Sequence, residues 1–348
     1  MCQAGIKQET GLYKVKRLHI ELTDKCQAAC PMCARNHNGY STRPFIKNTE
    51  IGIEDFKQWF PPEFLQTLTN FYSSGNYGDP AFATDCLEIY KYIKESNPDI
   101  YSAMHTNGSL RKPEWWAELA QYINEVTFAV DRFKGKHELY RRNTDFDKVI
   151  ENIKAFVAAG GKANINSLVF AHNEDDVEEL EKFLLGIGVS QIQFRHTTRF
   201  YSVVNFPVFD NHNKFVYNLQ PSKNTKVTEP LEKLLDSAVR DDVVAKSVID
   251  PKCVNLNEVF VDCRGNLFPC SYLGSDYVEE PLTEITVINA LRNISIYTTK
   301  QHLNKLTVPN LYDAPITEVL TDNLWNNLPD LWSDKKCLTC VNTCSKNS

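Results

Sequence analysis

Residues 18 to about 196 alternate between short apolar runs and amphipathic stretches, and this alternation constrains the fold more than any other feature of the sequence. The apolar runs have the length of buried strands, and the stretches between them have helical spacing. About six such units in a row predict an α/β protein with a parallel sheet and helical crossovers, either an open sheet or a partial barrel. The expected strands are residues 18–23, 68–74, 100–106, 125–130, 162–170 and 190–196.

The alternation stops near residue 200. Residues 201–250 are polar with one expected helix over 229–248, and we expect this connecting segment to shape the substrate site. Apolar and polar residues alternate over 257–270, which predicts a β-hairpin that turns at 263–266. The expected units are an N-terminal extension (1–17), the α/β region (18–200), the connecting segment (201–250) and a small C-terminal domain (251–348).

Composition excludes several classes of protein. No apolar run approaches the roughly 20 residues of a membrane-spanning helix, and the N-terminus lacks the apolar core of a secretion signal. The net charge of −6 gives no general case for nucleic-acid binding. An odd count of 11 cysteines in a long chain without a signal argues against a disulfide framework and favours a cytoplasmic location. Most of these cysteines form two groups, which suggests two metal sites.

The first group is Cys26, Cys30 and Cys33, directly after the first expected strand. Three thiolates this close together can hold three corners of an iron–sulfur cube and leave the fourth iron open, whereas such clusters normally have four cysteine ligands. The alternatives are a zinc site or unrelated surface thiols. Zinc knuckles favour a CxxC pair with a second pair nearby, which this triplet lacks.

The run CQAACPMC resembles the CxxxCxxC motif of the radical S-adenosylmethionine (SAM) superfamily. The resemblance implies a partial (β/α)6 TIM-like barrel and a [4Fe–4S] cluster whose open iron is chelated by the amino and carboxylate groups of SAM. It also implies reductive cleavage of SAM to methionine and a 5′-deoxyadenosyl radical, which abstracts hydrogen from a substrate. Met32 occupies the position of a bulky residue near the adenine.

Two turns after the next strands extend the resemblance. Gly78-Asp79-Pro80 resembles the GGEP motif, whose backbone holds the SAM amino group, with a shorter acid. Glycine allows close backbone approach, and a carboxylate can face an ammonium group. Asn107 belongs to a TNG triplet that is common in relatives with an auxiliary-cluster domain. Both segments could equally be ordinary βα turns.

Polar residues also follow the fourth strand and lie on the fifth. Asp131 and Arg141 resemble an Asp and an Arg of the same relatives, and they either line the pocket or form a solvated salt bridge. Asn166 and Ser167, with Asn164, occupy a strand that should be buried, which favours contact with the SAM ribose over packing. Either face of that strand could carry the contact.

Two later groups have weaker signals. His172, Asn173 and Glu174 are expected to begin a helix. His196 and Arg199 follow the sixth strand and could touch the substrate, although no motif supports them. The sequence assigns no catalytic side chain.

The C-terminal thiols resemble a second site. The run Cys253-x11-Gly265-x4-Cys270 resembles the CX(9–15)GX4C opening of SPASM and twitch domains, which hold auxiliary [4Fe–4S] clusters. The later cysteines of a full SPASM domain are missing, so the shorter twitch domain with one cluster is favoured. Cys263 and Cys344 remain spare, and either could substitute as a ligand. Structural zinc suits the same thiols by chemistry. The ligands that the resemblance implies are Cys253, Cys270, Cys337 and Cys340.

These features predict a radical SAM enzyme with one auxiliary cluster, which either accepts an electron in a net oxidation or holds the substrate. The cofactors implied are two [4Fe–4S] clusters and SAM, and the partner is an external one-electron donor such as flavodoxin or ferredoxin. Because only about 17 residues precede the barrel, we expect a leader-binding module to be absent or to be a separate protein. This favours a small molecule, nucleotide or carbohydrate over a peptide. The alternatives are a peptide-modifying maturase and a non-catalytic iron–sulfur or zinc protein on a decayed scaffold.

Overall fold

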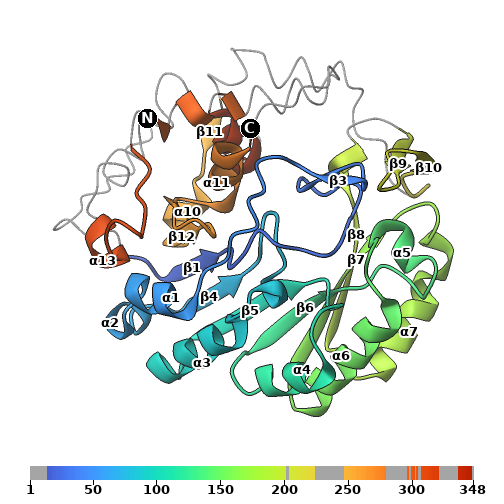
Figure 1. The fold of residues 1–348 in the computed structure, drawn as a ribbon, viewed down its shortest axis with the longest axis horizontal. Helices are drawn as coiled ribbons and strands as arrows, with labels where there is room; N and C mark the ends of the chain where they lie inside the picture. Colours follow the sequence, from blue (N-terminus) through green and yellow to red (C-terminus); the bar gives the residue numbers. More distant parts are fainter. Residues whose placement is uncertain are drawn as a thin grey trace.

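The computed structural model describes residues 14–200, 204–223, 247–279, 296–297, 299–301, 303–304, 307–320 and 336–346. Its centre is an eight-stranded sheet in the order β13-β12-β1-β4-β5-β6-β7-β8. Six neighbouring strands are parallel and follow each other in chain order, which confirms the expected α/β partial barrel (Figure 1). They are β1 (Arg17–Ile20), β4 (Asn70–Ser73), β5 (Tyr101–Thr106), β6 (Glu125–Ala129), β7 (Lys162–Val169) and β8 (Gln191–His196).

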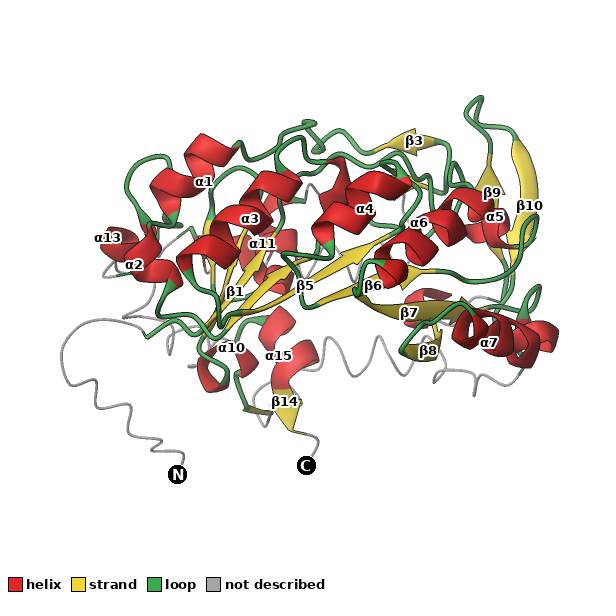
Figure 2. Cartoon of the chain, turned by 90° about the horizontal axis from the view of Figure 1, so that it is seen from below, coloured by secondary structure: helices red, strands yellow, loops and turns green. Residues whose placement is uncertain are grey.

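Helices cover the outer face of this curved sheet (Figures 1 and 2). Their ends follow the expected turn residues: Gly160 after α6 has a φ of +90° and Gly188 after α7 has a φ of +91°, a conformation that glycine adopts at low cost. No helix among the described segments is long and apolar enough to cross a bilayer. The helices are α1 (Ile53–Trp59), α2 (Pro62–Leu65), α3 (Cys86–Ser96), α4 (Pro113–Leu119), α5 (His137–Tyr140), α6 (Phe146–Ala158) and α7 (Val177–Gly186).

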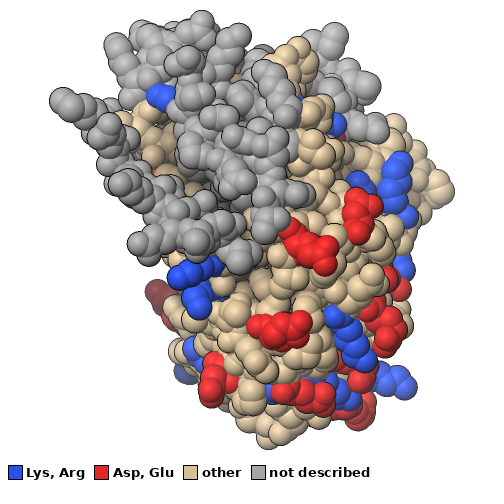
Figure 3. All heavy atoms as spheres, turned by 90° about the vertical axis from the view of Figure 1, so that its left-hand side faces the viewer, with Lys and Arg blue, Asp and Glu red and all other residues tan. Residues whose placement is uncertain are grey.

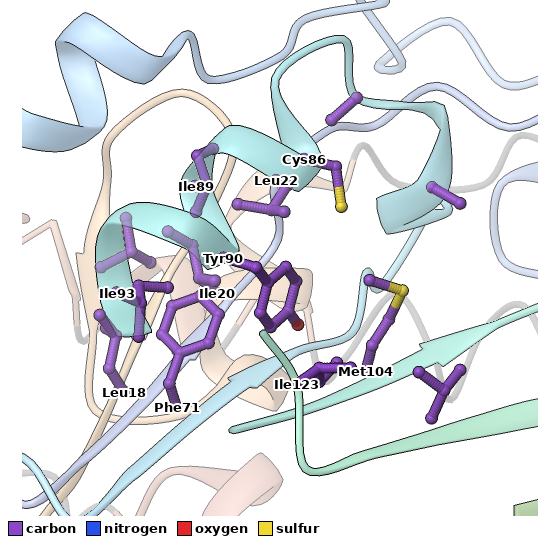
Figure 4. Close-up of a cluster of buried hydrophobic side chains, with 14 of the residues drawn as sticks. Leu18, Ile20, Leu22, Phe71, Cys86, Ile89, Tyr90, Ile93, Met104 and Ile123 are labelled. Atoms are coloured by element: carbon purple, nitrogen blue, oxygen red, sulfur yellow. The ribbon is translucent and has the colours of Figure 1, made fainter. Parts of the chain in front are cut away.

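The core lies between these helices and the sheet, as Figure 4 shows for α3. Phe71 of β4 packs edge-on against Tyr90 of the helix, and Leu18 of the neighbouring strand lies beside Phe71; all three are buried. The Tyr90 hydroxyl also donates to the Ala103 carbonyl at 2.9 Å, so this helix is fixed to β5. Burial of each such side chain stabilises the fold by about 1.5–3 kcal/mol. Cys86 is fully buried in this core, so it is a packed thiol.

The C-terminal hairpin joins the barrel sheet. Its strands are β12 (Glu258–Val261) and β13 (Leu267–Phe268), and β12 pairs with β1 in parallel. The hairpin itself was expected, but the sequence placed it in a separate unit. Pairing with β1 satisfies a sheet edge that would otherwise be exposed and buries apolar side chains such as Val259. The short helices α10 (Lys252–Asn255) and α11 (Ser271–Val278) flank it.

A second hairpin occupies the start of the connecting segment. β9 (Phe206–Phe209) and β10 (Phe215–Leu219) pair antiparallel, where the sequence indicated only a polar stretch. The helix expected over 229–248 lies almost entirely outside the described residues. The remaining elements are β2 (Asn36–His37), β3 (Ser41–Thr42), β11 (Val248–Ile249), α13 (Ile316–Val319), α15 (Leu338–Cys344) and β14 (Ser345–Lys346).

Candidate functional site

The three-cysteine loop lies at the carboxyl end of β1. Cys30 is buried, and Cys26 and Cys33 are half-buried. A turn in which the Cys33 N–H donates to the Cys30 carbonyl at 3.1 Å shapes the loop. Burial raises the pKa of Cys26, and burial raises that of Cys30 to about 11, partly opposed by the positive charge of Arg141. Cys26, Cys30 and Cys33 are free thiols, so this loop can supply three ligands.

The donor set fits an iron–sulfur cluster better than a single ion. Among the described residues, no three His, Cys, Asp or Glu side chains are arranged to hold one metal ion. A cluster does not require such convergence, because each thiolate binds a different iron. Cys30 and Cys33 also lie near enough to Cys26 to add to the rise in its pKa that burial causes. Thiolate ligands on a loop at the strand ends therefore fit the group that the family motif implies.

The glycine turn after β4 is fixed against the start of this loop. The Asp79 N–H donates to the Lys25 carbonyl at 2.9 Å. A Cβ atom added to Gly78 would lie 1.7 Å from the Thr23 carbonyl oxygen, so only glycine fits here. The buried carboxyl of Glu21 accepts hydrogen bonds from the N–H groups of Tyr77 at 2.7 Å and Gly78 at 3.0 Å. The turn and the cysteine loop are thus one connected unit.

Glu21 should make stability depend on pH. Burial raises its pKa from 4.5 to about 8, so between these values the folded protein holds a proton that the unfolded chain has lost. Stability should therefore fall as pH rises through this window, by up to about 1.4 kcal/mol per pH unit. Glu21→Gln keeps an acceptor oxygen for the two N–H groups but cannot ionise in this pH range. Urea unfolding at pH 5.5, 6.5 and 7.5 should give a flatter dependence for the variant; parallel dependences would contradict this.

Asp79 connects the glycine turn to the TNG segment. Its carboxylate accepts from the Asn107 N–H at 2.7 Å, the Thr106 hydroxyl at 2.8 Å and the Ala81 N–H at 3.0 Å. These donors use most of its acceptor capacity. Asp79 therefore orients residues 106–107, where the sequence suggested that it faces an ammonium group. Pro80 is buried and begins a short 3₁₀ helix.

Asn107 is aimed back at the cysteine loop. Its side-chain amide N lies 3.8 Å from the Cys26 sulfur, and its amide oxygen accepts from Gln27 at 2.8 Å. Sequence reasoning missed Gln27, which carries no motif signal. It also missed Glu21, which could have been noticed as an acid in an otherwise apolar strand.

Asp131 and Arg141 form a buried ion pair, so the solvated salt bridge is excluded. The Arg141 Nε donates to Asp131 at 2.8 Å, and the Asp131 side chain is fully buried. The guanidinium also hydrogen-bonds to the Cys30 thiol, and this contact partly opposes the rise in the Cys30 pKa that burial causes. Asp131 accepts the Leu168 N–H at 2.8 Å, which ties the pair to β7. A fixed positive charge thus stands beside the middle cysteine.

The fifth barrel strand presents its two asparagines to the concave side. Ala163 and Ile165 pack into the helix-covered core, so Asn164 and Asn166 point the other way and Ser167 points toward the helices. The side-chain oxygens of both asparagines are buried and have no hydrogen-bond partner among the described residues. Unpaired buried oxygens are costly, and a bound polar ligand would satisfy them. The Ser167 hydroxyl is also buried without a partner, but it faces the helices, so Asn166 is the one of the two that lies on the concave side.

An apolar cluster covers the other flank of the loop. Met32 and Cys30 pack with Phe170, and with Val208 and Leu219 of the β9–β10 hairpin. The connecting segment therefore contacts the cysteine loop directly in its described part.

Of the polar residues that follow the fifth and sixth barrel strands, Arg199 contacts the cysteine loop and Asn173 shapes a turn. Arg199 donates to the Met32 carbonyl at 3.2 Å. His196 lies exposed at the end of β8. Asn173 is buried and donates to the Asp131 and Leu168 carbonyls, as expected for a residue that shapes a turn.

The late cysteines group differently from the expectation. β11 and β14 pair, and the Asp250 N–H donates to the Cys344 carbonyl at 2.7 Å, which brings Cys344 toward Cys253. Burial raises the pKa of Cys253 to about 12, and the Cys344 thiol contributes. Both thiols also raise the pKa of Cys270, so the three lie together. The sequence predicts Cys344 to be a spare thiol, whereas the structure places it with Cys253 and Cys270.

The other late thiols have separate surroundings. The Cys263 sulfur lies 3.4 Å from the Thr49 hydroxyl, against the barrel. The Cys337 sulfur lies 3.6 Å from the Thr299 hydroxyl. Cys340 is one helical turn before Cys344 in α15, so these two share a helix face.

Comparisons with known proteins agree with this geometry. Residues 20–184 match the family model described as "Radical SAM superfamily". The chain is 22% identical over 271 residues to a GTP 3′,8-cyclase of Aquifex aeolicus, covering 74% of this chain and 82% of the relative. It is 25% identical over 192 residues to the FeMo cofactor biosynthesis protein NifB of Methanocaldococcus infernus, covering 49% and 63%.

The fold is also similar to a solved structure. The crystal structure of Streptococcus suis SuiB bound to S-adenosylmethionine aligns with a TM-score of 0.55 and 13% identity, over 94% of this chain and 72% of that one. At this identity the likeness concerns the fold alone. The match over residues 20–184 coincides with the parallel strands and the three-cysteine loop described above. Residues 20–184 are therefore a radical SAM domain, and the chain that carries it is a radical SAM enzyme.

Proposed function

We propose that the chain cleaves SAM reductively at a [4Fe–4S] cluster bound by Cys26, Cys30 and Cys33, and that it uses the resulting radical to abstract hydrogen from a small substrate. When bound, the cluster supplies the electron and SAM supplies the 5′-deoxyadenosyl group. The observation that carries the proposal is the convergence of two buried networks on the cysteine loop: Asp79 with Asn107 near Cys26, and Asp131 with Arg141 beside Cys30.

Different residues would bind different parts of SAM. Arg141, whose Nε and Nη2 already donate to Asp131, offers its fixed positive charge to the SAM carboxylate. The backbone at Gly78 accommodates close approach of the amino group, and Asp79 keeps Asn107 directed at the loop. Asn166 has an unpaired buried oxygen for a ribose hydroxyl. Met32 contributes an apolar surface for the adenine.

We further propose an auxiliary [4Fe–4S] cluster in the C-terminal region. Cys253, Cys270 and Cys344 support it, because they lie together: burial and the Cys344 thiol raise the pKa of Cys253, and burial and both other thiols raise that of Cys270. Cys340, on the same face of α15 as Cys344, completes four thiolates. This set replaces Cys337, which contacts Thr299 instead. An electron-accepting cluster suits a net oxidation.

Two single substitutions test this ligand set. Reconstituted Cys344→Ala should lose most of the auxiliary cluster, so iron should fall from about eight toward about four per chain. Cys337→Ala is the matched control and should keep its iron. Both should keep the signal of the N-terminal cluster in electron paramagnetic resonance spectra. Loss of iron from Cys337→Ala but not from Cys344→Ala would instead identify Cys337 as the ligand. Zinc in place of iron at these thiols would identify a structural zinc site.

A nucleotide is the first substrate class to examine. The GTP 3′,8-cyclase of Aquifex aeolicus is a relative across 82% of its own length, and its name specifies a nucleotide. Its substrate is an analogy for this chain, whose concave face carries Asn164 and Asn166 as hydrogen-bonding groups. We also propose a reducing, cytoplasmic compartment with an external one-electron donor, since the three cysteines of the loop after β1 are free thiols.

The decisive experiment is anaerobic incubation of the reconstituted protein with dithionite and SAM, followed by assay of 5′-deoxyadenosine. Nucleoside triphosphates, sugars and a peptide panel are then added separately. Formation of 5′-deoxyadenosine that rises only with nucleotides supports the proposal. A rise only with peptides would indicate a maturase. No product under any condition would favour a non-catalytic iron–sulfur protein.

A further inference from the structure

Tyr77 lies between the glycine turn after β4 and the C-terminal region, and it contacts both. It directly precedes Gly78-Asp79-Pro80, the segment proposed to hold SAM. Its N–H donates to the Glu21 carboxyl group at 2.7 Å, so its backbone is fixed to the residue that follows β1. Its side chain is 5% exposed and lies against α11, where it meets Ser275, 198 residues further along the chain. Tyr77 therefore joins the turn to a distant helix.

The Tyr77 hydroxyl belongs to a closed polar network at the end of α11. It lies 2.8 Å from the Ser275 hydroxyl, 3.1 Å from the Ser275 carbonyl oxygen and 3.0 Å from a carboxyl oxygen of Glu279. The Ser275 hydroxyl donates to the same Glu279 oxygen at 3.0 Å. Each of the three side chains is a partner of the other two, so removal of the Tyr77 hydroxyl takes a partner from both of the others.

The ring of Tyr77 and the residue before it add packing and a second hydrogen bond. Phe45 meets the ring edge-on, with the ring centroids 5.2 Å apart. The Asn76 side-chain amide donates to the Ser271 carbonyl at 2.9 Å. Ser271 and Ser275 are one helical turn apart, so both contacts lie on one face of α11. The cavity left at this junction has a volume of about 10 Å³, which is room for about one water molecule.

Helix α11 begins at a thiol of the proposed auxiliary site. Cys270 is its N-cap residue, and the Gly274 N–H donates to the Cys270 carbonyl at 3.2 Å. A Cβ atom added to Gly274 would lie 2.8 Å from the Phe260 ring, so the helix lies directly on β12. The eight residues of α11 therefore connect a proposed cluster ligand with the groups that hold Tyr77. A shift of Cys270 is expected to displace those groups.

Buried acids mark this junction as an interior contact. On the face shown in Figure 3, acidic and basic side chains are interspersed at the surface. Glu21 and Glu279 are instead 2% and 3% exposed, and each accepts a hydrogen bond from Tyr77: Glu21 from the N–H and Glu279 from the hydroxyl. A carboxyl group is buried where donors replace water. The two donors of Tyr77 therefore hold one acid of the barrel and one of the C-terminal region.

We propose that Tyr77 is a positioning residue of the SAM site, which fixes the glycine turn to α11 and makes SAM affinity depend on the C-terminal thiols through Cys270. The inference rests on the proposed function, in which this turn receives the SAM amino group. A glycine-rich turn loses much conformational entropy when it is ordered. An anchor that orders the turn before SAM arrives reduces this cost and strengthens binding. The Tyr77 hydroxyl supplies the anchor, and the helix carries the position of Cys270 to it.

Removal of the Tyr77 hydroxyl tests the positioning role. Tyr77→Phe and Ser275→Ala each remove one member of the network, and Tyr92→Phe is the matched control, because the Tyr92 hydroxyl donates to the Phe60 carbonyl at 3.1 Å in the helical layer. The dissociation constant of SAM from the oxidised, reconstituted protein should rise about fivefold in the first two variants and stay unchanged in the control. The cleavage rate at saturating SAM should remain within about twofold of wild type. Unchanged affinity in Tyr77→Phe would overturn the positioning role.

A double-mutant cycle tests the connection to the thiols. Cys270→Ala should also raise the SAM dissociation constant about fivefold, and the double variant with Tyr77→Phe should bind SAM no more weakly than either single variant. Multiplied effects in the double variant would show that the two residues act independently and would overturn the connection, as would unchanged affinity in Cys270→Ala. Iron per chain is measured for each protein, so that SAM affinity is expressed per N-terminal cluster.

Amide hydrogen exchange before reconstitution gives a readout that needs neither cluster nor SAM. Exchange over residues 74–80 should become about fivefold faster in Tyr77→Phe, while residues 101–106 of β5 keep the wild-type rate. Equal acceleration of both segments would identify general destabilisation and overturn the positioning role. If the wild type forms no 5′-deoxyadenosine while residues 74–80 respond as expected, the proposed function fails and the anchoring of the turn stands.

Discussion

Replacement of Cys26, Cys30 and Cys33 together by alanine is expected to remove about four irons per chain and to abolish formation of 5′-deoxyadenosine. The physical reason is that a cluster on this loop has no other thiolates to use. In the described part of the chain, the other thiols that lie together are Cys253, Cys270 and Cys344, which belong to the C-terminal region. The measurement is iron and sulfide per chain after anaerobic reconstitution, with product assayed by chromatography.

The matched control is Cys86→Ala, because Cys86 is a buried thiol in the α3 core and takes no part in the loop. Its iron content should equal that of the wild type. The unchanged auxiliary signal in the triple variant would show that the fold survives. Retention of eight irons in the triple variant would contradict the assignment of the N-terminal cluster.

Asp79→Ala is expected to lower the rate of SAM cleavage by about 100-fold or more while the N-terminal cluster still assembles. Asp79 touches no cysteine ligand by a hydrogen bond; it fixes Asn107 and Thr106, which face the loop. A displacement of about 1 Å in a positioned group can cost about 100-fold in rate. Loss of the carboxylate also leaves buried donors unpaired, at about 1–3 kcal/mol each. SAM affinity and cleavage rate are measured separately.

Asp147→Ala is the control for removal of a carboxylate, because Asp147 pairs with Lys134 at the exposed start of α6. Exposed pairs contribute about 0–1 kcal/mol, so this variant should behave as wild type. If Asp79→Ala lost stability but kept the full rate of cleavage per cluster, the carboxylate would be only a structural element of the turn.

Local sequence features determined the parallel barrel and the position of its cysteine loop. Strand and helix periods can be read over a few residues, and the carboxyl ends of parallel strands must share one edge of the sheet. For this reason the three-cysteine loop, the glycine turn at 75–80 and the TNG segment at 105–109 were expected near each other, and in the structure they are joined by hydrogen bonds.

The tertiary structure alone decided what each polar group does. Asp79 and Asn107 are 28 residues apart, so no local sequence pattern predicts the hydrogen bond between them. The choice of Asn166 over Ser167 depended on which face of β7 the helices cover. Arg141 could have been solvated, but packing placed it on Asp131 and the Cys30 thiol.

The sequence by itself therefore determined the resemblance to radical SAM proteins, the fold of residues 18–196 and the position of the three-cysteine loop, because spacing along the chain carries that information. Only the tertiary structure decided that β12 extends the barrel sheet, that the β9–β10 hairpin covers the loop and that Cys344 lies with Cys253. Each of these is a contact between distant segments, and it is set by burial and strand pairing that no single segment encodes.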